Sequence, residues 1–171
     1  KDPVYINSTS DLPASSGLGS SSAFTVGLLK AIYYLKGVKK SNRALAEEAC
    51  EIEIQRIKKP IGKQDQYACA IGGINYLGFN SNDSVTIKKN LKVQNFINKI
   101  LPNSLLIWTG ILRESESILA NQVKDLKKGK INADTYNLKN ICEIFYKEAS
   151  NFDGKNFLEL NEFFIECLNK N

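Results

Sequence analysis

A run of glycines and serines at residues 17–22, Gly-Leu-Gly-Ser-Ser-Ser, constrains the fold of this chain more than any other feature. Two glycines one residue apart allow positive φ angles and let a ligand approach the backbone closely. Apolar residues then recur at helical spacing over residues 20–36, and Gly37 follows as a helix stop. Because the first turn of a helix has unpaired N–H groups and a partial positive charge, this junction predicts a phosphate-binding loop. The alternative, without ligand binding, is a flexible linker or an ordinary capped helix.

Two well-known phosphate loops do not fit this run. A Walker-type loop requires a lysine before the final Ser or Thr, and the run has none. A dinucleotide-binding loop requires a third glycine and an acidic residue after the next strand, whereas the next predicted element here is a second helix. What remains is a serine-rich phosphate loop without lysine.

The rest of the chain predicts mixed helices and strands. A short strand is expected at 4–7 and a polar turn at 8–16. A helix capped by Ser41 should run to about Lys59 and stop at Pro60. A short helix capped by Asp65 follows over 65–71, and paired strands follow at 74–79 and 84–88. Beyond these we expect a strand at 104–109, a helix at 114–128 and two terminal amphipathic helices.

Composition narrows the chemistry. The chain has no histidine, which excludes Ser-His and Cys-His nucleophiles, and its four cysteines form no C-x-x-C pair. The net charge of +5 is spread along the chain without a block of like charges, so nucleic-acid binding is not expected. There is no apolar run of about 20 residues and no leader, so we expect no membrane segment and a cytoplasmic protein. The absence of methionine suggests a trimmed or partial polypeptide.

The second helix offers a metal ligand. On helical spacing, Glu53 lies on a face of small or apolar residues that includes Ala46, Ala49 and Cys50. A charge on such an inward face is costly unless it is paired or binds a metal. Glu51 instead lies on a solvated face. We therefore predict Glu53 as a Mg²⁺ ligand, with an ion pair to Arg56 as the alternative.

These residues carry a resemblance to a known family. The pattern P-x-x-x-G-L-G-S-S-S-A from Pro13 resembles the phosphate-binding motif of the GHMP kinases, a superfamily of small-molecule kinases. The resemblance implies that the loop wraps the phosphates of ATP and that Ser21 and Glu53 bind Mg²⁺. The implied ATP phosphate-binding residues are Ser16, Gly17, Leu18, Gly19, Ser20, Ser21 and Ser22.

A second segment points to a branch of that superfamily. Residues 62–66, Gly-Lys-Gln-Asp-Gln, resemble the catalytic segment of the D-glycero-D-manno-heptose 7-phosphate kinases. By that resemblance Asp65 is the catalytic carboxylate and Lys63 balances charge near the substrate; helix capping alone would also explain Asp65. A weaker likeness at 108–113 suggests that Thr109 and Arg113 approach the sugar phosphate. A surface salt bridge explains Arg113 about as well.

The resemblance implies an α+β fold of the GHMP kinase type. Residues 1–90 would be part of an N-terminal ATP-binding domain, related to domain 2 of ribosomal protein S5, and residues 91–171 part of the C-terminal domain. Two further family motifs would precede Lys1 and follow Asn171, so the isolated chain should turn over poorly.

The expected activity is ATP-dependent phosphorylation of a sugar phosphate. The expected ligands are ATP, Mg²⁺ and the sugar, and self-association is left open. The alternatives are another GHMP kinase, acting on galactose, fucose or mevalonate, or a non-catalytic nucleotide or sugar sensor.

Overall fold

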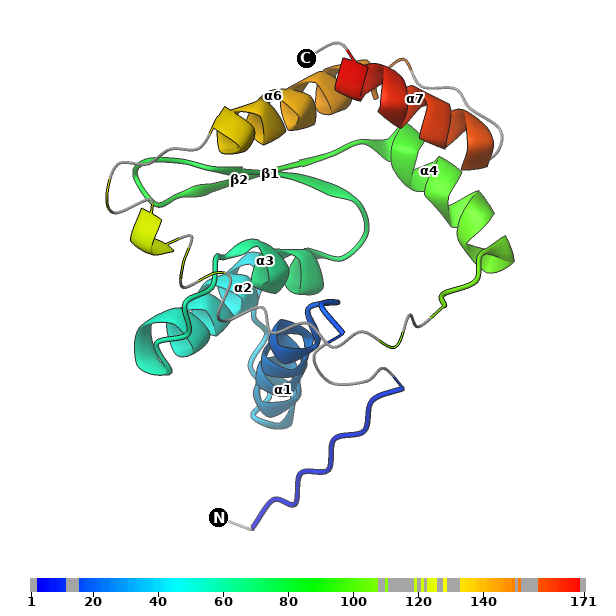
Figure 1. Cartoon of the computed structure of the whole chain (residues 1–171). Coiled ribbons are helices and arrows are strands. Elements are labelled where there is room, and N and C mark those ends of the chain that lie inside the picture. Colours follow the sequence, from blue (N-terminus) through cyan, green and yellow to red (C-terminus); the bar gives the residue numbers. More distant parts are fainter. Residues whose placement is uncertain are drawn as a thin grey trace.

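The computed structural model describes residues 3–11, 16–107, 110, 119, 121, 123–125, 128, 133–149, 151 and 157–169. Helices α1, α2 and α3 pack together, a β-hairpin lies next to them, and α6 lies across the far side of that hairpin (Figure 1). Helices and strands are thus segregated along the chain, as expected for an α+β arrangement. Within the described residues, no helix is long and apolar enough to cross a membrane.

The first helix forms where the sequence predicts it. Helix α1 spans Ser20–Leu35, directly after the glycine-serine run, and Gly37 follows it with a φ of 65°. Val26 and Leu29 are buried on one side of α1, where they pack with Leu45 of the next helix. The same helix therefore carries the predicted phosphate loop at its start and a core-forming face along its length.

The second helix begins as predicted but ends with an irregular turn. Helix α2 spans Asn42–Cys50, and the hydroxyl of Ser41 caps it by accepting a hydrogen bond from the Ala44 N–H at 3.2 Å. A wider π-helical segment, η1, continues it over Glu51–Arg56. The chain leaves the helix at Lys58, whose φ of 61° is left-handed, so the helix ends before Pro60 is reached.

The third helix corrects one prediction. Helix α3 spans Gln64–Ile71, and Lys63 stands at its N-cap position without a side-chain capping bond. Asp65 therefore lies inside the first turn and is not the cap. Acidic side chains favour the first turn because the helix dipole is positive there. Tyr67 of α3 is buried against Ala46 and Cys50 of α2.

The predicted strand pair is confirmed. Strands β1 (Asn75–Phe79) and β2 (Val85–Lys89) form an antiparallel hairpin in which Leu77 lies opposite Ile87. Val85, Leu77 and Ile87 pack on the core of α2 and α3. Tyr76 points to the other face, where its ring centre lies 4.5 Å from that of Tyr146 in α6. The hairpin thus separates the α1–α3 layer from the C-terminal helices (Figure 1).

One helix was not predicted. Helix α4 spans Leu91–Ile100, and the Asn90 side chain caps it by accepting from the N–H groups of Lys92 and Val93. A short 3₁₀ turn, η2, follows over Leu101–Asn103. Buried Val93 and Phe96 lie three residues apart on one face of α4. The C-terminal helices α6 (Ala133–Glu148) and α7 (Phe157–Asn169) confirm the two amphipathic helices expected there.

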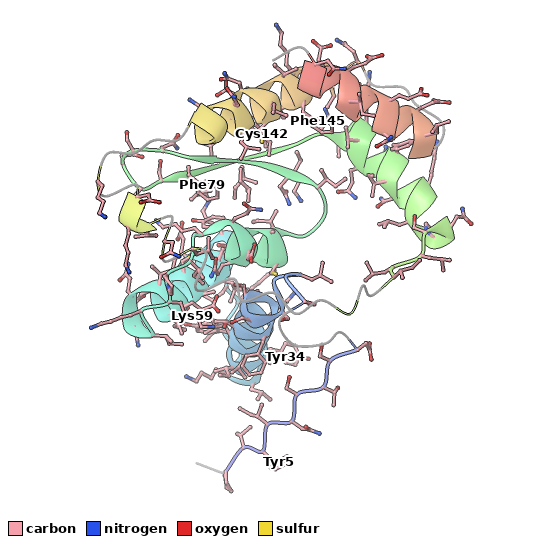
Figure 2. All side chains as sticks on the ribbon, in the orientation of Figure 1. Tyr5, Tyr34, Lys59, Phe79, Cys142 and Phe145 are labelled. Carbon is pink, nitrogen blue, oxygen red and sulfur yellow. The ribbon has the colours of Figure 1, made fainter. Side chains whose placement is uncertain are left out.

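Among the described residues, two predicted strands do not form; the second was expected at 104–109, of which 108 and 109 lie outside the described part. Residues 4–7 and 104–107 are in no strand, and no described strand lies beside either segment. A strand requires a partner for its backbone groups, so apolar sequence alone does not make one. Both segments are open to solvent: Tyr5 is 91% exposed, on an extended stretch away from the helices (Figure 2), and Leu105 is 90% exposed. The helix predicted at 114–128 lies mostly outside the described residues.

Candidate active site

The glycine-serine run has the backbone of an anion-binding loop. Gly17 and Gly19 have φ angles of 74° and 70°, and Gly19 is the residue that leads into α1. The first turn of α1 contains no acidic residue that would occupy its N–H groups. The buried Ser16 hydroxyl oxygen, next to Gly17, has no hydrogen-bond partner in the described structure. These features fit a loop that binds a ligand rich in hydrogen-bond acceptors.

Glu53 is the most deeply buried acid in the described chain, at 1% exposure. Three side chains donate hydrogen bonds to its carboxylate: Ser21 to Oε1 at 2.7 Å, Ser22 to Oε2 at 2.9 Å and Gln66 to Oε2 at 2.6 Å. Since Ser21 and Ser22 open α1 and Gln66 is in α3, the carboxylate joins all three helices. The prediction that Glu53 faces inward is confirmed. Arg56 pairs with Glu51 at 2.7 Å, so the alternative Glu53–Arg56 ion pair is wrong.

These contacts keep Glu53 charged. Burial by itself raises the pKa of the Glu53 carboxyl, but hydrogen bonds from Ser21, Gln66 and Ser22, together with the positive charge of Lys59, outweigh burial and leave the pKa below its ordinary value. A buried anion held by hydrogen-bond donors is suited to binding a cation.

Lys59 is a neighbour of Glu53 that the sequence reasoning missed. Its Nζ donates to Ser21 Oγ at 2.7 Å and lies 3.6 Å from Glu53 Oε1. The Lys59 side chain is only 27% exposed, and it lies between the ribbons of α1 and the α2–η1 segment (Figure 2). No spacing rule points to it, because the left-handed Lys58 turns the chain back toward Glu53.

Asp65 lies beside Gly19, the second glycine of the phosphate loop. A Cβ added to Gly19 would come within 3.5 Å of Asp65 Oδ2, so the catalytic candidate and the second glycine of the loop are in contact distance. Asp65 is exposed to solvent, in the first turn of α3, while its neighbour Gln66 is fully buried and bonded to Glu53. Asp65 therefore faces the solvent-exposed side of the site, and Gln66 faces its buried side.

Of the weaker substrate candidates, only Lys63 lies within the described residues, and it is not part of this group. Lys63 pairs with the Asp83 carboxylate on the hairpin turn. It lines an open pocket of about 270 Å³ with residues of α2, η1 and the hairpin, a pocket that does not include Ser21, Glu53 or Asp65. Thr109 and Arg113 lie outside the described residues.

The residues present fit Mg²⁺. This ion binds oxygen ligands, commonly through one or two carboxylates with the remaining positions filled by phosphate and water. Ser21 Oγ and Glu53 Oε1 are two such oxygens, 2.7 Å apart. The positively charged ammonium of Lys59 already binds there, which shows that the position favours a cation. No group of three or more acidic or cysteine side chains that could hold a metal occurs among the described residues. A metal here would therefore depend on a phosphate ligand as well.

Comparison with known proteins agrees with the geometry. Residues 2–73 match the family described as GHMP kinases N terminal domain, and this segment contains the loop, Glu53, Lys59 and Asp65. A curated relative, the D-glycero-alpha-D-manno-heptose 7-phosphate kinase of Campylobacter jejuni, is 34% identical over 127 residues. The alignment covers 74% of this chain and 36% of the relative. The chain thus spans about a third of the length of the relative it matches.

Proposed function

From the match of residues 2–73 to the N-terminal domain of the GHMP kinases, we propose that the protein is an ATP-dependent sugar kinase. It transfers the γ-phosphate of ATP to a hydroxyl of a sugar phosphate. The observation that carries the proposal is the convergence of three separate segments on one point. Ser21 at the start of α1 bonds to Glu53 of η1, and Gly19, two residues before Ser21, lies beside Asp65 of α3.

The roles follow from what each group can do. The N–H groups at the start of α1, with the Ser16 hydroxyl, would hold the phosphates of ATP. Ser21 and Glu53 would hold Mg²⁺, which supplies charge neutralisation on the phosphates. Asp65, exposed beside Gly19, would accept the proton of the acceptor hydroxyl. The acceptor oxygen forms its bond to the γ-phosphorus as the bond from that phosphorus to the bridging oxygen breaks, which releases ADP.

The acceptor we favour is D-glycero-D-manno-heptose 7-phosphate. The support is the Gly-Lys-Gln-Asp-Gln segment at 62–66 and the 34% identity to a heptose 7-phosphate kinase. Lys63, Thr109 and Arg113 remain our candidates for contacts with the substrate. A substrate of this kind, with ATP as donor, fits a cytoplasmic enzyme that makes precursors of cell-surface sugars.

We also propose the family's division into domains, with 1–90 in the ATP-binding domain, of the S5 domain 2 type, and 91–171 in the C-terminal domain. Helix α4 would open the second part. Gln94 of α4 accepts a hydrogen bond from the Ile74 N–H at 2.7 Å, so the two parts are joined directly at their border.

The decisive experiment is Asp65→Asn in the full-length protein. ADP release is measured with the heptose phosphate and, for comparison, with galactose, fucose and mevalonate. We expect kcat with the heptose phosphate to fall by roughly 100-fold or more, the usual scale for loss of a general base, while ATP binding is retained. Asp125→Asn, an exposed helical aspartate, is the matched control and should leave kcat unchanged. Full activity in Asp65→Asn would refute the assignment.

A further inference from the structure

The Lys59 ammonium lies 3.6 Å from Oε1 of the Glu53 carboxylate. We propose that Lys59 is a built-in competitor of the metal: its ammonium occupies the position between Ser21 and Glu53 that Mg²⁺ would take, and has to leave before the metal can bind. This inference rests on the proposed function, because it assumes that Ser21 and Glu53 are the metal ligands. It adds a residue that tunes metal affinity.

The geometry holds Lys59 in place at two points. Its backbone N–H donates to the Glu53 carbonyl oxygen at 3.0 Å, and its side-chain Nζ donates to Ser21 Oγ at 2.7 Å. The backbone bond depends on Lys58, whose φ of 61° reverses the chain after η1. A non-glycine residue in this conformation is strained by about 1 kcal/mol or more. The neighbouring Lys58 is itself exposed, so the two lysines differ sharply in surroundings.

The two cations would compete for the same oxygens. Ser21 Oγ donates its proton to Glu53 and accepts from Lys59. A Mg²⁺ ion bound to the same oxygen at about 2.1 Å would stand within roughly 5 Å of the ammonium. Charges of +1 and +2 at that distance repel, and both would draw on the single carboxylate of Glu53. Metal binding therefore requires the Lys59 side chain to swing out toward solvent, which its partial exposure allows.

The test is Lys59→Met in the full-length protein, with Lys58→Met as matched control. Both variants remove one positive charge, from adjacent residues, and keep a side chain of similar length. Binding of Mn²⁺, a spectroscopic substitute for Mg²⁺, is measured by electron paramagnetic resonance with and without ADP. We expect Lys59→Met to bind Mn²⁺ roughly tenfold more tightly than the wild type, which corresponds to about 1.4 kcal/mol. Lys58→Met should change the affinity less than threefold.

A second readout is independent of affinity. In chelator, Lys59→Met should melt at a lower temperature than Lys58→Met, because the buried Glu53 carboxylate loses its counter-charge. Added Mn²⁺ should then raise its melting temperature more than that of the wild type.

Three results would overturn the inference. Unchanged Mn²⁺ affinity in Lys59→Met would mean that the ammonium does not compete. Weaker binding in the presence of ADP would make Lys59 a phosphate ligand instead. If neither the wild type nor Lys59→Met bound Mn²⁺, while Asp65→Asn still abolished kinase activity, the metal site would be misplaced and the kinase assignment would stand. Loss of the Asp65 effect, by contrast, bears on the proposed function alone.

Discussion

Gly19 and Asp65 face each other across the junction of α1 and α3, so closely that a Cβ on Gly19 would lie 3.5 Å from Asp65 Oδ2. The distance is an ordinary van der Waals contact, but the φ of Gly19 is 70°, which side chains other than glycine disfavour. A methyl group would also fill the space between the loop and the proposed catalytic acid. Gly19 is thus constrained by its own backbone and by its neighbour.

We predict that Gly19→Ala destabilises the fold by about 1–2 kcal/mol, the cost of a left-handed non-glycine residue. For a chain of this size that corresponds to a melting temperature lower by about 2–8 °C. Kinase activity should fall further than stability explains. Gly27→Ala is the control: Gly27 lies inside α1 with nothing within 4 Å of an added Cβ, so it should stabilise by about 0.5–1 kcal/mol. A Gly19→Ala variant as stable as the wild type would contradict the prediction.

The inward position of Glu53 could be predicted because helical spacing is a local rule. Ala46, Ala49 and Cys50 are all buried as their face requires, and Glu53 follows them. The rule then fails one turn later. Arg56 and Ile57, three and four residues after Glu53, would share its face in a regular α-helix but are exposed, because the π-helical segment η1 shifts every following residue around the axis.

Lys59 and the unformed strands could not be predicted for related reasons. Lys59 reaches Glu53 only because Lys58 adopts a left-handed conformation that lysine rarely takes. The segments 4–7 and 104–107 have strand-like sequence, yet a strand also needs a neighbour, which a local pattern does not specify. Helix α4 could have been predicted from the sequence, because Asn90 is a good N-cap residue and Val93 and Phe96 are spaced for one helical face.

A second glycine allows a test of how α4 is attached. A Cβ on Gly73 would overlap Gln94 Oε1, the atom that accepts the Ile74 N–H, and Gly73 has a φ of 73°. We predict that Gly73→Ala costs about 2–3 kcal/mol in urea unfolding, the sum of backbone strain and a broken hydrogen bond. In a Gln94→Ala background only the strain of about 1 kcal/mol should remain. Equal costs in both backgrounds would show that the two residues are not coupled.

The cysteines should differ in reactivity. Burial raises the pKa of the Cys50 thiol to about 11, and the residue is only 6% exposed. At pH 8 roughly one Cys50 in a thousand would then be in the reactive thiolate form. We predict that iodoacetamide labels the exposed Cys142 well before Cys50, as followed by mass spectrometry of the native protein. In urea the two rates should become similar, and early labelling of Cys50 in the native protein would count against its buried position.

The Glu53 carboxylate should make stability depend on acid pH. Its pKa is lowered on folding from an ordinary value of 4.5, because the hydrogen bonds and the Lys59 charge outweigh the effect of burial. Its stabilising contribution is therefore fully present above pH 4.5 and is lost as the pH falls through the lower folded-state pKa.

In urea unfolding between pH 6 and 3, wild type should lose more stability than Glu53→Gln, which has no such group to protonate. At pH 6, Glu53→Gln should already be less stable than wild type by about 1–3 kcal/mol, because the glutamine amide nitrogen cannot accept from the surrounding donors. Glu51→Gln, on the same helical turn but 46% exposed, should follow the wild-type pH curve. Parallel curves for wild type and Glu53→Gln would mean that the carboxylate is not held as an anion, and that the proposed metal site lacks its charge.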